Sequence, residues 1–178
     1  IHDQLAELNP DFARNTRTYL DYARDHDLCL SHGLHDPCMD KSLRPSEDPD
    51  RCVRVVKERD DGVVVRGARF NTFGIFSNEI LVSPTYQFNE DEEDFAIWFT
   101  IPCNASGLKQ VAREAFSGRN PLDHPVSAGF DEIDSLAIFD DVFVPWERIF
   151  LYREPLAANR LFRGNVMSWA SYAGSVLT

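Results

Sequence analysis

The stretch RDDGVVVRGARFNTFGIFSNEILVSPT, residues 59–85, decides the fold because it carries a tight turn between two strand-forming runs. The DDG triplet at 60–62 has the Asp-Gly signal of a two-residue hairpin, whose central residues must tolerate positive φ. The β-branched residues on either side predict an antiparallel pair of strands over residues 52–58 and 63–69.

Gly67 and Gly74 interrupt the same stretch after the turn. A glycine inside a strand pattern marks a bulge or the close approach of another group to the backbone. The pattern therefore predicts an irregular strand at these positions, without identifying the group that approaches.

Further short apolar runs follow the hairpin and are separated by turn residues. They predict strands over residues 79–83, 95–101, 108–112, 135–139, 142–144 and 149–152. Short strands at this density are typical of an antiparallel sandwich or barrel. The predicted fold class is α+β, with an antiparallel β-barrel or sandwich in the middle of the chain and helical segments at its edges.

Helical patterns flank this middle region. Asn9 and Pro10 form the cap and first turn of an amphipathic helix that runs to about Leu28, and a largely apolar helix pattern follows Pro155. We expect an N-terminal helical domain that ends in residues 1–36, a middle β domain over 37–153, and a C-terminal helical domain that begins in 154–178.

The composition narrows the class of protein. The chain has 178 residues, of which 43% are hydrophobic, so a folded core is expected. Its 29 acidic and 18 basic residues give a net charge of -11, which argues against nucleic acid as a partner. The acidic clusters SEDPD, ERDD and NEDEED are interpreted as solvated loops.

Two features bear on location. No apolar run reaches the roughly 18 residues that cross a bilayer, and the first residues lack the zones of a signal peptide. The four cysteines are too sparse for a disulfide framework, so we expect them to be reduced. Together these features predict a soluble protein, most simply cytoplasmic, with no membrane contact.

Cys29, His32, His35 and Cys38 stand at a spacing of three that superficially suggests zinc. In a helix each such step leaves the next side chain about 60° off and about 4.5 Å further along, so the outer pair would face opposite sides. The Asp36-Pro37 pair also breaks a helix inside the set. We expect no metal.

His32 is a candidate on its own, because it stands where the first helix gives way to a loop. A histidine titrates near neutral pH and can accept a proton from a hydroxyl group. A capping or packing role is the alternative. The chain has neither a G-x-S-x-G nucleophile elbow nor a glycine-rich phosphate loop.

Four segments carry a resemblance to a known family. LSHGLHDPCMDKS with RPSED behind it, RVVKERDDGVVVRGARFNT, FTIPCNASGLKQVARE and IFDDVFVPWERIFLY resemble the 4-hydroxyphenylacetate 3-hydroxylase family, the oxygenase component of two-component flavin-dependent monooxygenases. The resemblance covers residues 11–152. It implies an acyl-CoA dehydrogenase-like fold, usually assembled as a homotetramer, of which this chain would hold the middle β domain and the edges of two helical domains.

The resemblance also implies functional residues. His32 matches a histidine that contacts both the phenolic hydroxyl group and the flavin, and Gly33 and Leu34 continue that flavin-facing segment. Thr72 matches a threonine that hydrogen-bonds the isoalloxazine ring. A loop that lies along the flavin corresponds to Pro45, Ser46, Glu47 and Asp48.

Pro84 and Thr85 match a pair that reaches the carboxylate end of the substrate. The family often has serine at the position of Pro84, and proline has no N–H to donate. Thr85 alone would then hold that end of the substrate.

The implied activity is hydroxylation of a phenol similar to 4-hydroxyphenylacetate, ortho to its hydroxyl group. The cofactor would be reduced FAD, with FMN as the other option, supplied by a partner flavin reductase. The flavin would react with O₂ through a C4a-hydroperoxyflavin, while His32 serves as general base and the surrounding protein excludes water. The chain alone is expected to be inactive.

Two alternatives remain open at this point. A 4-hydroxybutyryl-CoA dehydratase would share the fold but add an iron-sulfur cluster, for which VPWERIFLY offers neither cysteine nor histidine. A non-catalytic β module that mediates assembly is the other alternative.

Overall fold

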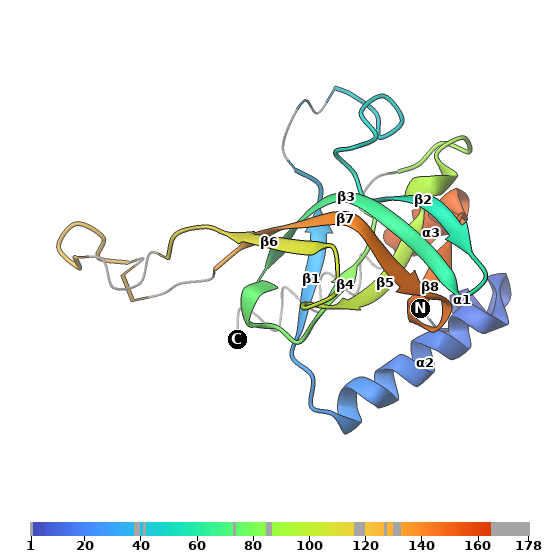
Figure 1. Ribbon diagram of the computed structural model, residues 1–178, viewed down its shortest axis with the longest axis horizontal. Coiled ribbons are helices and arrows are strands. Elements are labelled where there is room, and N and C mark those ends of the chain that lie inside the picture. Colours follow the sequence, from blue (N-terminus) through green and yellow to red (C-terminus); the bar gives the residue numbers. More distant parts are fainter. Residues whose placement is uncertain are drawn as a thin grey trace.

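The computed structural model describes residues 2–37, 40, 42–72, 74–84, 87–115, 120–126, 128–129 and 133–164. The helices within them are α1 (His2–Leu8), α2 (Pro10–Asp25) and α3 (Pro155–Gly164), with the short 3-10 turns η1 (Gly74–Phe76), η2 (Glu93–Phe95) and η3 (Trp146–Arg148). The strands are β1 (Leu30–His35), β2 (Arg54–Arg59), β3 (Gly62–Thr72), β4 (Glu79–Val82), β5 (Ile97–Pro102), β6 (Leu108–Ala112), β7 (Ser135–Pro145) and β8 (Ile149–Tyr152). Figure 1 shows their arrangement.

The strands of the described residues form one sheet in the order β6-β7-β3-β1-β4-β5-β8, and β2 pairs with β3 outside this path. The α+β class is thereby confirmed. The sheet is mixed, however, because β1 and β4 run parallel while the other pairs are antiparallel.

Strand β1 is absent from the sequence-based prediction, which treated residues 30–33 as a junction between helix and loop. The LSHGLH segment lacks a β-branched residue and contains a glycine, so its strand character is invisible locally. It forms because β3 and β4 flank it on both sides and satisfy its backbone hydrogen bonds.

The predicted hairpin is confirmed, since Arg59 pairs with Gly62 across a two-residue turn. The central residues of the turn, Asp60 and Asp61, do not have the expected positive φ. Among the described non-glycine residues, φ is positive only at Asp27, Asp141 and Arg153. Gly62 is required for another reason. A Cβ atom there would lie 2.2 Å from the carbonyl oxygen of Val144 on β7.

The strands predicted over 135–139 and 142–144 are one continuous strand, β7. Asp140 and Asp141 form a bulge opposite Arg66, where the register between β3 and β7 shifts by one residue. Asp141 has a φ of 56°, and Arg66 holds its carboxylate through both oxygens at 2.7 and 2.9 Å. The two aspartates interrupt the apolar pattern, although the strand itself continues.

The groups that approach the two irregular glycines belong to the chain itself. A Cβ atom on Gly67 would lie 2.2 Å from the carbonyl oxygen of Cys52, and one on Gly74 would lie 2.1 Å from Nδ2 of Asn71. The missing side chains therefore make room for neighbouring protein segments.

The sheet curls strongly around its core. The rings of Phe99 on β5 and Phe139 on β7 are 5.8 Å apart, although three strands lie between β5 and β7 in the sheet. A flat sheet would separate them by roughly 19 Å, or four strand spacings. At the far edge, Tyr152 of β8 donates a hydrogen bond to Glu58 of β2 at 2.7 Å. The result is an incompletely closed barrel, seen in Figure 1.

Helix α2 begins as predicted, with the side chain of Asn9 accepting a hydrogen bond from the N–H of Asp11 at 2.9 Å. It ends at Asp25, a few residues before the predicted end. A buried carboxylate, Glu79 of β4, fixes α2 to the sheet, because it accepts hydrogen bonds from Tyr19 at 2.8 Å and Arg148 at 2.6 Å. The helix predicted after Pro155 is confirmed to Gly164, and its predicted continuation lies outside the described residues.

Candidate functional site

His32 and Thr72 are direct cross-strand neighbours, since His32 on β1 pairs in register with Thr72 on β3. Paired residues of adjacent strands project their side chains to the same face of a sheet. Two residues that stand far apart in the chain, and that the sequence proposed for one site, are thus brought together on one face.

Ser83, which the sequence did not single out, is a third residue beside His32. Nε2 of His32 lies 2.7 Å from Oγ of Ser83, the residue that follows β4. His32 pairs with Leu81 across the parallel strands, and Ser83 is two positions further along, on the same face. Ser83 is only 6% exposed. The signal needed to find it was the β1–β4 pairing, which the local sequence does not reveal.

The imidazole of His32 is neutral at physiological pH. Burial, and next the charges of Arg69 and His35, together lower the pKa of His32 to about 4. Arg69 is itself buried and pairs with the carboxylate of Asp36 at 2.7 Å. His32 is therefore a hydrogen-bonding group with one ring N–H and one acceptor nitrogen.

The face around His32 and Thr72 carries exposed apolar side chains. Leu30 lies two residues before His32 and is 42% exposed, and Phe70 lies two residues before Thr72 and is 40% exposed. Thr72 is exposed as well. A flat aromatic group with polar edges, such as an isoalloxazine ring, fits this combination of an apolar surface, a hydroxyl group and a neutral imidazole.

The two neighbours of His32 on β1 have different surroundings. A Cβ atom on Gly33 would point to the inner face, 3.3 Å from Ile80 and 3.5 Å from Val82. Leu34 stands at the register shift between β1 and β3 and is half-buried. Gly33 thus faces the barrel interior, opposite to His32, while its backbone continues the strand.

The predicted flavin loop, Pro45 to Asp48, is held by a buried carboxylate that the sequence analysis placed in a solvated cluster. Glu92 is fully buried, which corrects that interpretation of NEDEED. It forms an ion pair with Arg44 and accepts hydrogen bonds from Ser46 Oγ at 3.3 Å and from the N–H of Asn89 at 2.8 Å. Pro45 is buried, and Ser46 and Glu47 are exposed.

Arg44 also donates a hydrogen bond to the carbonyl oxygen of Gln87 at 3.0 Å. The predicted flavin loop is thereby tied to the segment that follows the predicted substrate residues. Of those, Pro84 is buried directly after Ser83, and Thr85 lies outside the described residues.

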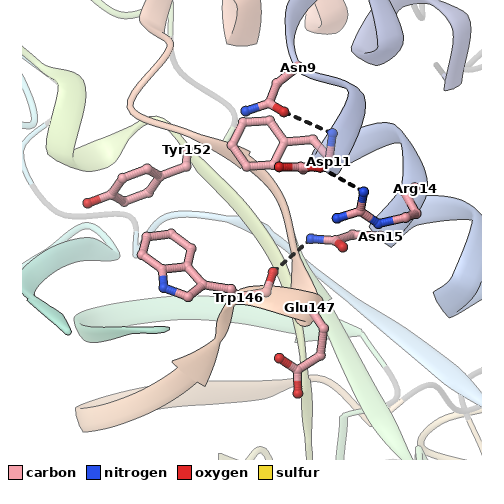
Figure 2. A pocket seen from close by; sticks show the side chains of 8 residues that line it. Asn9, Asp11, Arg14, Asn15, Trp146, Glu147 and Tyr152 are labelled. Carbon is pink, nitrogen blue, oxygen red and sulfur yellow. Dashed lines mark hydrogen bonds and ion pairs between the residues drawn. The ribbon is translucent and has the colours of Figure 1, made fainter. Parts of the chain in front are cut away.

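A cavity of about 480 Å³ lies elsewhere, between the start of α2 and η3, and is shown in Figure 2. Several of its polar side chains are engaged within the protein: Asn15 donates to the carbonyl oxygen of Trp146 at 2.8 Å, and Arg14 pairs with Asp11 at 2.7 Å. None of the predicted site residues lines it. The cavity belongs to the contact between α2 and the sheet.

Two further findings concern the described residues alone. They contain no helix long and apolar enough to cross a bilayer. They also contain no group of three or more histidine, cysteine, aspartate or glutamate side chains placed to hold a metal ion, and Cys38 lies outside them.

The curled sheet with flanking helices is of the type found in acyl-CoA dehydrogenase-like proteins. The chain belongs to the 4-hydroxyphenylacetate 3-hydroxylase family, whose N-terminal region, described as "4-hydroxyphenylacetate 3-hydroxylase N terminal", matches residues 1–151. The family resemblance read from the sequence is thus confirmed.

One curated relative is the 4-hydroxyphenylacetate 3-monooxygenase oxygenase component of a Geobacillus species, 41% identical over 168 residues, or 91% of this chain and 34% of the relative. A solved structure of such an oxygenase component complexed with FAD is 40% identical, with a TM-score of 0.78 over 91% of this chain and 34% of that one. The chain therefore spans about a third of the length of these relatives.

A 4-hydroxybutyryl-CoA dehydratase from N. maritimus is equally close in fold. Its TM-score is 0.80 at 29% identity, over 90% of this chain and 34% of that chain. Neither fold similarity nor sequence identity separates the two classes of relative, since a 4-hydroxybutyryl-CoA dehydratase of Clostridium aminobutyricum is 36% identical over 81% of this chain.

Proposed function

We propose that this protein acts as the oxygenase component of a two-component flavin-dependent monooxygenase, which hydroxylates a phenol ortho to its hydroxyl group. The observation that carries the proposal is the pairing of a neutral His32 with Thr72 on one exposed face of the sheet. The 40% identity to an oxygenase component complexed with FAD supports the choice of cofactor.

Reduced FAD, when bound, would give the two electrons that activate O₂, so that one oxygen atom is transferred to the ring and the other leaves as water. Thr72 would hold the edge of the isoalloxazine by a hydrogen bond, and Phe70 and Leu30 would cover part of its plane. The loop from Pro45 to Asp48 would lie along the cofactor. Apolar side chains around the ring keep water from the reacting atoms.

His32 would accept a hydrogen bond from the phenolic hydroxyl group. That hydrogen bond polarises the O–H bond and raises electron density at the ortho carbon, which is the atom that must attack oxygen. Because burial and Arg69 hold the pKa of His32 at about 4, the ring resists full protonation and acts as an acceptor. His32 is therefore the proposed catalytic residue.

Pro84 and Thr85 would lie at the far end of the substrate. A buried Pro84 has no N–H to offer a carboxylate, so Thr85 would hold this end of the phenol alone. The substrate class is a phenol similar to 4-hydroxyphenylacetate.

The remaining parts of the proposal concern partners. A separate reductase would deliver the reduced flavin, O₂ would be the second substrate, and a cytoplasmic homotetramer would be the working form. Cys29, Cys52 and Cys103 are free thiols, which is compatible with a reducing compartment.

The test uses the full-length gene product with a flavin reductase, NADH, FAD and 4-hydroxyphenylacetate. His32→Ala should abolish formation of the catechol while NADH oxidation and H₂O₂ release continue. His26→Ala is the matched control, because His26 is exposed at the end of α2 and belongs to none of the proposed contacts, and it should retain product formation. Undiminished catechol formation by His32→Ala would contradict the assignment.

The likeness to the dehydratase makes that activity the second candidate. Metal analysis and a visible spectrum of the purified protein separate the two. We expect a flavin spectrum without iron, and stoichiometric iron would favour the dehydratase.

A further inference from the structure

We infer that Ser83 fixes the tautomer of His32 by accepting a hydrogen bond from its Nε2–H, which leaves Nδ1 as the free acceptor for the phenol. Nε2 and Oγ are 2.7 Å apart, a short and direct contact between two side chains from different strands. The inference rests on the proposed role of His32 and gives Ser83 the role of a positioning residue.

In the hydrogen bond between His32 Nε2 and Ser83 Oγ, either group can be the donor. If Ser83 donated its hydroxyl proton, Nε2 would be the acceptor and Nδ1 would carry the ring proton. The nitrogen left for the substrate would then be a donor, which cannot accept the phenolic proton. If Ser83 accepts from Nε2–H instead, Nδ1 is unprotonated and available. Only the second direction allows His32 to act as proposed.

The tautomer matters because the ring is neutral. Burial, and next the charges of Arg69 and His35, hold the pKa of His32 at about 4, so at pH 7 a single ring proton is shared between two positions. Asp36 pairs with the guanidinium of Arg69. Arg69, Asp36 and His35 therefore set the local charge around the ring of His32. A fixed partner at Nε2 decides where that one proton resides.

Ser83 is well placed for this task. Its side chain is 6% exposed, and its N–H donates to the carbonyl oxygen of Gly33 at 3.4 Å, next to His32 in the chain. The following residue is Pro84, whose ring restricts the backbone of Ser83. The hydroxyl group is thus held against the imidazole by two neighbouring strands.

The first test measures the tautomer directly, without flavin or substrate. Ring-nitrogen NMR of the ¹⁵N-histidine-labelled full-length protein at pH 7 distinguishes protonated from unprotonated nitrogens, and His32→Gln identifies the His32 signals among the histidines. We expect a protonated Nε2 and an unprotonated Nδ1. A protonated Nδ1 in the unsubstituted protein would overturn the inference.

Variants of Ser83 supply the second test. Ser83→Ala should give a mixture of both tautomers, whereas Ser83→Thr, which keeps the hydroxyl group, should restore the single form. Amide spectra and unfolding midpoints verify that both variants fold. A single Nε2–H tautomer in Ser83→Ala would show that Ser83 does not fix it.

Activity then links the tautomer to the reaction. Ser83→Ala should lower the yield of catechol per flavin oxidised by about 10- to 100-fold, with rescue by Ser83→Thr, since losing the tautomer costs less than the roughly 10²- to 10⁴-fold effect of losing the general base itself. If His32→Ala loses hydroxylation but Ser83→Ala does not, the inference fails while the proposed function stands. If the tautomer is as expected but the unsubstituted protein forms no catechol, the proposed function fails instead.

Discussion

At the scale of single residues, the lowered pKa of His32 makes the stability of the fold depend on pH. The pKa of His32 is about 4 in the folded chain, against 6.5 for an unperturbed histidine. Between these two pH values the unfolded chain binds a proton that the folded chain does not. Stability should therefore fall as the pH decreases from 6.5 to 4.

His32→Gln removes this titration and should flatten that part of the stability curve. The full effect corresponds to roughly 3 kcal/mol at 1.36 kcal/mol per pKa unit. Chemical denaturation of both proteins at pH 7, 5.5 and 4 measures it. An equal loss of stability in the two proteins over this interval would show that His32 titrates normally.

Thr72 permits a second prediction at this scale. Thr72→Val keeps the shape of the side chain and removes the hydroxyl group proposed to bond the isoalloxazine. The affinity for reduced FAD should fall by about 1–3 kcal/mol, the usual loss for an unmet buried hydrogen bond. Anaerobic titration of the full-length protein measures this affinity, with Thr72→Ser as control. Equal affinities of Thr72→Val and the unsubstituted protein would remove Thr72 from the cofactor site.

At the scale of elements, the ion pair between Arg44 and Glu92 fixes two loops at once. Burial alone would raise the pKa of Glu92, but hydrogen bonds from Arg44 and from the N–H of Asn89 outweigh it and hold the pKa below its usual value. Arg44 also donates a hydrogen bond to the carbonyl oxygen of Gln87, so it links the proposed cofactor loop to the segment after the proposed substrate residues.

Glu92→Gln should loosen both loops and cost about 1–3 kcal/mol of stability, because Arg44 would lose its charged partner. Hydrogen exchange should increase at residues 44–48 and 87–89. The stability difference should shrink as the pH falls below 4.5, since a carboxylate with a lowered pKa stabilises the fold above its unfolded pKa. Glu90→Gln, an exposed neighbour in the same acidic run, is the control. Identical hydrogen exchange at residues 44–48 and 87–89 in both variants would show that the Arg44–Glu92 ion pair does not hold the two loops.

The elements also show what local sequence can and cannot predict. The hairpin at 59–62, the cap at Asn9 and most strands follow from short-range signals, and the structure confirms them. Strand β1, the pairing of His32 with Ser83 and the burial of Glu92 arise from contacts between distant segments. Family resemblance proposed His32 and Thr72 together, and the register of β1 with β3 explains how they meet.

At the scale of the whole molecule, the sheet presents two different surfaces. Its inner face closes around Phe99 and Phe139, and α2 is fixed to the sheet through Glu79. Leu30, His32, Phe70 and Thr72 share the other, partly exposed face of β1 and β3. The exposed Leu30 and Phe70 beside His32 and Thr72 make this part of the outer face a suitable support for a flat cofactor, because the sheet holds these side chains in fixed register.

The most direct measurement of the central claim is isotope incorporation by the full-length gene product. Reduced FAD, a reductase, 4-hydroxyphenylacetate and ¹⁸O₂ are combined, and the product is analysed by mass spectrometry. We expect a catechol that carries one ¹⁸O atom in its new hydroxyl group. Absence of any hydroxylated product, or a new hydroxyl oxygen derived from water, would contradict it.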